Sequence, residues 1–372
     1  MNSPAAPARE LHRVLMTADT VGGVWTYAID LCRGLANYGV QVVMLSMGRL
    51  PDECQSREAA RLANLTLIPT EYRLEWMSGC EADLARSGEL LLALEQEFQP
   101  DIVHLNTYWH AALLFGSPVL LAAHSCVPSW WAACRGTQLP EEWSSYCAMV
   151  RKSLEVADVL VAPSAAYLRE FQRLHGPAPR WRLIRNGRDP GLFRNGAKRH
   201  LVLAAGGIWD EAKNIRLLCD AAHGLPLPIV VAGDATGPNG ETAPGKNVTL
   251  LGRLAPAELA KWMTCASIFV APARYEPFGL SVLEAALSGC ALVLGDIPTL
   301  RELWDGAAIF VNPSDPDELR SVLNDLAERP TRCAELGAKA CARAAHYSLA
   351  RMARSYHQTY CSLLAGRMEA VA

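Results

Sequence analysis

The 372-residue sequence has no Cys-x-x-Cys pair, although it contains 12 cysteines. The cysteines are spread singly along the chain. Such spacing is typical neither of a zinc site nor of a small fold that is stabilised by disulfide bonds. We therefore expect reduced thiols, most of them buried, and we predict no metal site.

The sequence also lacks a long hydrophobic run and an excess of charge of one sign. No segment approaches the roughly 20 apolar residues that a membrane helix needs, and the first ten residues lack the apolar core of a signal peptide. The formal net charge is −3, which is not the basic footprint of a nucleic-acid-binding protein. We expect a cytoplasmic protein without a nucleic-acid partner.

Two familiar phosphate-binding fingerprints are missing as well. The sequence contains neither Gly-x-Gly-x-x-Gly nor Gly-Lys-Ser/Thr, so the usual dinucleotide and triphosphate loops are absent. This absence argues against an NAD-dependent enzyme.

Short apolar runs of strand length recur along the chain, and each is followed by a segment with helical periodicity. The first series lies at residues 14–18, 40–46, 101–106, 119–125, 157–164 and 182–187, and the second at 200–207, 227–234, 247–252, 267–273, 290–296 and 307–313. Alternation of this kind predicts an α/β fold with two doubly wound parallel sheets.

A connector rich in Gly, Asn and Arg separates the two series at residues 185–200. We place the domain boundary at Pro190, which gives domains of residues 1–189 and 190–347. Residues 348–372 contain a last helix with no strand after it, so we predict that this helix crosses back over the domain junction.

In open parallel sheets the ligand lies at the carboxyl ends of the strands, so residues directly after strands are the candidates for a site. Gly22 and Gly23 follow the first strand, and His124 follows a later one. Lys213 lies where the first helix of the second domain should begin. Each has an alternative structural interpretation: a tight turn, a structural histidine and an exposed lysine.

The segment YEPFGLSVLEAAL, residues 275–287, carries two glutamates around a helix start. We expect Pro277 in the first helical turn, Glu276 at the N-cap side and free amides from Phe278 to Leu280. Glu284 lies inside the apolar helix, where a buried carboxylate needs a partner. A bound polyol such as a ribose would supply that partner.

Three further features leave alternatives open. Trp130, Trp131 and Trp143 flank a polar segment after His124 and suit either stacking on a sugar acceptor or core packing. The basic segment 173–199 suits either an acidic membrane surface or a solvated connector. Asp315 precedes Pro316 and is expected to cap a helix rather than to bind a metal.

Together these residues resemble a family 4 glycosyltransferase, a retaining enzyme of the GT-B fold. The resemblance rests on the paired glycines, His124, NGRDPGLF (186–193), Lys213 and the Glu-x7-Glu pair of Glu276 and Glu284. It implies two Rossmann-like domains facing a cleft, an acceptor-side N-terminal domain, a donor-binding C-terminal domain and a returning terminal helix.

The resemblance also implies roles for individual residues. It makes His124, Lys213 and Glu276 the catalytic residues. The donor-binding set that it implies is Gly22, Gly23, Lys213, Arg253, Leu254, Glu276, Pro277, Phe278, Gly279, Leu280 and Glu284. We place Trp25, His104, Trp130 and Trp131 on the acceptor side.

The implied reaction moves a hexosyl unit from a UDP- or GDP-linked sugar to a hydroxyl of a glycan, lipid or small molecule, without a cofactor. One departure from the family is Gly207, where an arginine that contacts the diphosphate is usual. Arg253 or Arg185 could substitute for it. Two alternatives therefore stay open: a nucleotide-sugar-binding protein with weakened or lost turnover, and a nucleotide-sugar epimerase of similar fold.

Overall fold

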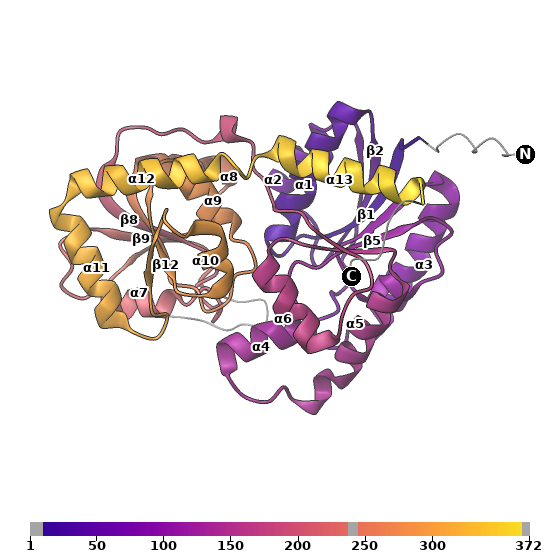
Figure 1. The fold of residues 1–372 in the computed structure, drawn as a ribbon, viewed down its shortest axis with the longest axis horizontal. Coiled ribbons are helices and arrows are strands. Elements are labelled where there is room, and N and C mark those ends of the chain that lie inside the picture. The colour runs from indigo at the N-terminus through magenta and orange to yellow at the C-terminus, as the bar shows by residue number, and fades with distance from the viewer. Residues whose placement is uncertain (1–9, 237–244, 367–372) are drawn as a thin grey trace, which may run out of the picture.

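The computed structural model describes residues 10–236 and 245–366. It contains two parallel sheets with helices packed on their faces (Figure 1). The first has the order β3-β2-β1-β4-β5-β6-β7 and the second has the order β10-β9-β8-β11-β12-β13. This architecture confirms the predicted pair of doubly wound domains.

The strands of the first sheet are β1 (Arg13–Asp19), β2 (Gln41–Met47), β3 (Leu65–Pro69), β4 (Ile102–Leu105), β5 (Val119–Ala122), β6 (Val159–Ala162) and β7 (Trp181–Leu183). Those of the second are β8 (Arg199–Ala205), β9 (Ile229–Ala232), β10 (Thr249–Gly252), β11 (Ala266–Ala271), β12 (Ala291–Gly295) and β13 (Ile309–Val311). Strand β3 was not predicted. It is a half-buried edge strand that ends in a proline, so it lacks the continuous apolar run of the central strands.

The helices of the first unit are α1 (Gly23–Leu35), α2 (Glu53–Ala60), α3 (Glu81–Phe98), α4 (Val127–Arg135), α5 (Ser144–Val156) and α6 (Ala165–His175). The second contains α7 (Ile215–Ala221), α8 (Pro256–Cys265), α9 (Leu280–Leu287), α10 (Pro298–Trp304), α11 (Pro316–Glu328) and α12 (Pro330–Ala344). Helix α11 begins after Asp315, whose side chain accepts hydrogen bonds from the backbone N–H groups of Asp317 and Glu318. The predicted capping role of Asp315 is therefore confirmed.

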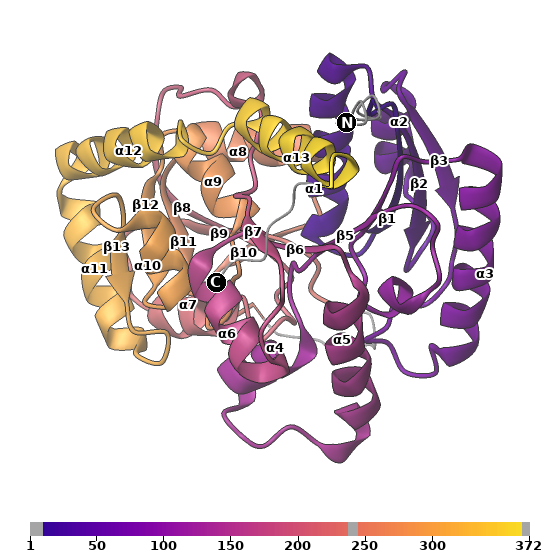
Figure 2. The ribbon, with the colours of Figure 1, turned by 45° about the vertical axis from the view of Figure 1, so that its right-hand side comes forward.

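The last helix, α13 (Leu349–Leu364), crosses from the second unit and packs against α1 of the first (Figures 1 and 2). Its side chains Met352, Tyr356 and Tyr360 are buried in the core of the first sheet. Gly34 on α1 makes room for it, because a Cβ at Gly34 would lie 2.4 Å from the Cβ of Ala353. The predicted return of the terminal helix is confirmed.

Two chain segments connect the sheets, and they run side by side. The N–H of Arg188 donates to the carbonyl of Tyr347 at 3.1 Å, and the N–H of Leu349 donates back to the carbonyl of Arg188 at 2.9 Å. The predicted boundary at Pro190 falls inside the first connector, between β7 and β8. The chain therefore passes between the two units twice, in adjacent segments that are hydrogen-bonded to each other.

Several basic residues of the segment 173–199 have partners within the protein. Arg173 pairs with Glu170, and Lys198 donates to the carbonyls of Met263 and Ser288. Among the helices of the described ranges, none combines the length and the apolar character needed to cross a membrane.

Candidate active site

A cleft of about 510 Å³ lies where the carboxyl ends of both sheets face each other. In each sheet the strand order changes direction beside this edge, between β1 and β4 and between β8 and β11. Ligands of doubly wound proteins bind at such positions. The cleft is lined by most of the predicted site residues, namely Gly22, Gly23, His124, Trp130, Lys213, Arg253, Leu254, Glu276, Pro277, Phe278, Gly279, Leu280 and Glu284.

The paired glycines form the turn between β1 and α1. The Oδ1 of Asp19 accepts hydrogen bonds from the N–H groups of Val21 and Gly22, both at 3.0 Å. A Cβ added at Gly23 would lie 3.7 Å from Cδ1 of Leu280 in the second sheet's unit. The backbone of the turn therefore approaches the opposite wall of the cleft closely.

His124 follows β5 and is held by an asparagine. Its Nε2 lies 2.7 Å from Oδ1 of Asn106, whose Nδ2 donates to the carbonyl of Thr17. That amide orientation leaves Oδ1 as an acceptor, so the proton of His124 is on Nε2. Burial lowers the pKa of His124 to about 4, which keeps the ring neutral at physiological pH.

Lys213 and Glu276 form an ion pair in the part of the cleft wall that the second unit provides. The Nζ of Lys213 lies 2.6 Å from Oε2 of Glu276. Burial alone would lower the pKa of Lys213, but the charge of Glu276 and its hydrogen bond outweigh burial and raise it. Asn214 holds the loop after β8, which carries Lys213, against the loops after β11 and β13. Its Nδ2 donates to the carbonyls of Pro272 (2.9 Å) and Pro313 (2.8 Å). A cation and a carboxylate therefore lie together at the base of the cleft.

Helix α9 begins later than predicted. Its first residue is Leu280, and its N-cap is Gly279 with a φ of 88°. The expectations that Pro277 lies in the first helical turn and Glu276 at its N-cap side are wrong, because Gly279, two residues after Pro277, caps the helix in a left-handed conformation. Ser164 of the first unit donates to the carbonyl of Pro277 at 2.8 Å and so holds this loop against α6.

Glu284 has a partner within the protein that the sequence did not reveal. Its Oε1 lies 2.9 Å from Nε of Arg188, and Arg188 also pairs with Asp30 on α1. All three side chains are nearly inaccessible, with 12%, 8% and 1% of their surfaces exposed. The idea that Glu284 needs a bound polyol to be buried is therefore wrong, although the residue does line the cleft.

Two residues predicted on the acceptor side lie elsewhere. His104 on β4 is fully buried, and its ring nitrogens lie 2.5 Å from the Tyr360 hydroxyl and 3.3 Å from the Tyr27 hydroxyl. It joins the returning helix to the core. Trp25 is 3% exposed and faces a neighbouring cavity beside α2, which shares Gly22, Thr26, Arg253 and Leu254 with the cleft. Its Nε1 lies 3.4 Å from Oε2 of Glu58. The prediction for His104 is wrong and Trp25 does not line the cleft itself, because strand and helix periodicity do not reveal which tertiary neighbour covers a side chain.

The aromatic residues after His124 divide between two cavities. Trp130 lines both the cleft and an adjoining aromatic cavity, whereas Trp131 and Trp143 line only the aromatic cavity.

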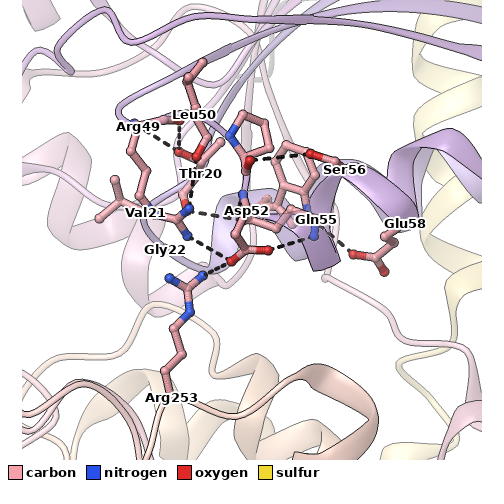
Figure 3. Close-up of polar contacts among 12 residues, drawn as sticks. Thr20, Val21, Gly22, Arg49, Leu50, Asp52, Gln55, Ser56, Glu58 and Arg253 are labelled. Atoms are coloured by element: carbon pink, nitrogen blue, oxygen red, sulfur yellow. Dashed lines mark hydrogen bonds and ion pairs between the residues drawn. The ribbon is translucent and has the colours of Figure 1, made fainter.

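Of the two cations considered as substitutes at the diphosphate, only Arg253 lines the cleft. Its Nη2 lies 3.1 Å from Oδ2 of Asp52, the N-cap of α2 in the first unit (Figure 3). Arg49 approaches the same carboxylate oxygen at 3.6 Å. Arg185 instead pairs with Glu302 at 2.5 Å, where α6 packs on α10.

Comparison with known proteins agrees with this geometry. Residues 21–192 match the model of Glycosyltransferase Family 4, and residues 199–329 match that of Glycosyl transferases group 1. Glycogen synthase of Mycobacterium tuberculosis is 26% identical over 84% of this chain and 86% of its own length. D-inositol 3-phosphate glycosyltransferase of Thermobispora bispora is 25% identical over 92% of this chain and 90% of its own length.

Solved structures show the same architecture. Sucrose-phosphate synthase from Thermosynechococcus elongatus superposes with a TM-score of 0.79 at 20% identity, covering 95% of this chain and all of the other. Anabaena Alr3699/HepE, solved in complex with UDP-glucose, gives a TM-score of 0.75 at 17% identity over 94% of this chain and 99% of the other. The chain is a GT-B glycosyltransferase that belongs to glycosyltransferase family 4.

Proposed function

We propose that the protein moves a hexosyl unit from a nucleotide-diphosphate sugar to an acceptor hydroxyl with retention of anomeric configuration. The donor is a UDP- or GDP-linked sugar, and the acceptor is carbohydrate in nature. UDP-glucose in the complex of the HepE neighbour supports such a donor, and the name of the glycogen synthase relative supports such an acceptor.

The reaction exchanges one bond for another. The bond between the anomeric carbon and the diphosphate oxygen breaks, and the acceptor oxygen bonds to the anomeric carbon on the same face. The acceptor hydroxyl loses its proton, which leaves with the nucleoside diphosphate or passes to water. The protein's task is to hold both partners and to stabilise the departing negative charge.

Lys213 has the chemistry for the departing charge. It is the cation within the cleft wall that faces Glu276, and it is held in place before any donor binds. We assign it to the diphosphate, in place of a metal ion, and we assign Glu276 to the hydroxyls of the transferred sugar. Preorganised charges of this kind need little rearrangement during the reaction.

Glu284 and His124 complete the proposed donor site. Glu284 is assigned to the ribose hydroxyls, with Arg188 holding one of its oxygens. His124 is assigned to the transferred sugar. Because its ring is neutral, it can exchange hydrogen bonds with hydroxyls without adding charge.

The observation that carries this proposal is the Lys213–Glu276 pair, at 2.6 Å, in a cleft between two strand-order reversals. A panel of UDP- and GDP-sugars tested for slow hydrolysis without acceptor checks the function and identifies the donor together. One donor should be hydrolysed by the wild type, and Lys213→Ala should slow that hydrolysis roughly 100-fold.

The same panel separates the alternatives. Nucleotide binding without hydrolysis or transfer would favour a binding protein. Conversion of one nucleotide sugar into its epimer would favour an epimerase.

A further inference from the structure

The aromatic cavity has a volume of about 400 Å³, adjoins the cleft and shares Val24, His124, Ser125, Trp130 and Asp210 with it. Half of the ten tryptophans in the sequence line this aromatic cavity, namely Trp76, Trp130, Trp131, Trp143 and Trp209. The first four come from the first unit, and Trp209 comes from the loop after β8 in the second. The aromatic cavity therefore opens beside the residues assigned to the transferred sugar.

Carboxylates provide the charged groups of this cavity. Asp19, Glu75 and Asp210 line it, and no lysine or arginine does so among the described residues. Burial raises the pKa of Glu75 to about 7, so Glu75 is neutral or negative near neutral pH, never positive. A phosphate group placed here would meet acceptors and negative charge, and the neighbouring cation, Arg135 over the Trp130 and Trp131 rings, is already paired with Glu211.

Polar atoms of the cavity suit hydroxyl groups. Carboxylate oxygens accept hydrogen bonds from hydroxyls, and the Nε1 of Trp143 is a buried donor for which the described residues provide no partner. Each of these carboxylates already accepts a hydrogen bond from a backbone N–H group and has lone pairs left for hydroxyls, which a purely aromatic ligand would not use. A sugar ring combines an apolar face for an indole with a rim of hydroxyls for the carboxylates.

Gly207 explains how Trp209 reaches this position. A Cβ at Gly207 would lie 2.7 Å from Nε1 and 3.0 Å from Cε2 of Trp209, closer than side chains pack. An arginine at 207 would therefore displace the indole. With glycine at position 207 the donor site lacks the arginine that is usual in the family, and the indole of Trp209 has room to line the aromatic cavity.

We infer that the aromatic cavity holds the acceptor of the proposed transfer, and that this acceptor is a saccharide without phosphate or carboxylate groups. Its ring stacks on the tryptophans while its hydroxyls donate to the carboxylates. The inference rests on the proposed function and narrows its acceptor class. It also gives Gly207 a role in acceptor recognition rather than in lost turnover.

Matched acceptor pairs test this inference with the donor found in the hydrolysis panel. Glucose and maltose are compared with glucose 6-phosphate and inositol phosphate by kcat/KM for transfer, and by quenching of tryptophan fluorescence with UDP bound. We expect the neutral sugars to be favoured at least roughly 10-fold over the phosphate esters. Preference for the esters, or binding of neither class, would overturn the inference.

Two variants locate the acceptor, with Trp181→Phe on β7 as a control outside the cavity. Trp76→Ala should raise the acceptor KM roughly 10-fold or more, because tryptophans that a ligand covers contribute much of the binding energy. Gly207→Arg should raise the acceptor KM to a similar extent. An unchanged KM in both would overturn the inference, whereas absence of donor hydrolysis in the wild type would refute the proposed function instead.

Discussion

Replacement of Arg188 by methionine tests the buried charge cluster that joins the two units. Methionine has a similar length but no charge, so Glu284 loses its ion pair and Asp30 keeps only Arg33. Removal of one partner from a buried ion pair costs about 3–5 kcal/mol. We expect a value near the lower end, about 3 kcal/mol, because Arg33 still compensates Asp30.

The same change should disturb the donor site. Burial already raises the pKa of Glu284, and the charge of Arg188 opposes this effect. Without Arg188 the carboxyl group should be protonated more readily, and its affinity for ribose hydroxyls should fall. UDP and GDP binding, measured by calorimetry, should weaken in Arg188→Met.

Urea unfolding followed by tryptophan fluorescence and circular dichroism measures the stability effect. The two units need not unfold together, so each transition is followed separately. Arg188→Met/Glu284→Gln should recover part of the loss because it removes the unpaired charge. Arg173→Met, which breaks only the exposed pair with Glu170, is the control and should change little. A loss below about 1 kcal/mol in Arg188→Met, or a double variant less stable than the single one, would refute the reasoning.

Three further predictions concern the cleft and the acid stability of the protein. Glu284→Ala should weaken UDP or GDP binding roughly 10- to 100-fold, since a hydrogen bond to a charged group is worth about 1.5–3 kcal/mol, and unchanged affinity in calorimetry would remove the ribose assignment. Glu276→Gln should lower donor turnover roughly 100-fold while nucleotide affinity changes little, and the reverse pattern would contradict the assignment to the sugar. Burial lowers the pKa of four histidines from 6.5 to about 3 or 4, so the unfolded chain binds more protons than the native protein below pH 6.5. Stability should therefore be intact above pH 6.5 and fall by up to about 1.4 kcal/mol per pH unit for each of these histidines as the pH drops toward 4, and urea midpoints that stay constant from pH 7 to 5 would contradict this. The four residues are His104, His110, His124 and His175.

Much of the fold was accessible from the sequence, because buried parallel strands are continuous apolar runs with helices between them. Strand β3 was not predicted, because an edge strand buries less of its surface and therefore lacks a continuous apolar run. Part of the cleft lining, including Gly22, Gly23 and His124, was also found, because these residues follow directly after strands whose carboxyl ends meet at one edge. Tyr27, Asp210 and Tyr275 line the cleft as well and were not predicted.

What the sequence did not reveal depends on contacts between distant segments. Arg188 and Glu284 are 96 positions apart by their numbers and pair only because the connector passes over α9. The indole of Trp209 occupies space that a side chain at position 207 would fill. From the sequence alone, Gly207 could be interpreted only as the loss of a cation that contacts the diphosphate. His104 was placed in the wrong environment because Tyr360, its hydrogen-bond partner, comes from the returning helix.

The central claim is that the cleft transfers sugar from a nucleotide-linked donor with retention. NMR spectroscopy of the reaction, using the donor from the hydrolysis panel, follows nucleotide release and the anomeric configuration of the product together. We predict that the wild type keeps the donor's configuration and that Lys213→Ala slows release roughly 100-fold. A product of inverted configuration, or no consumption of any nucleotide sugar, would contradict the claim.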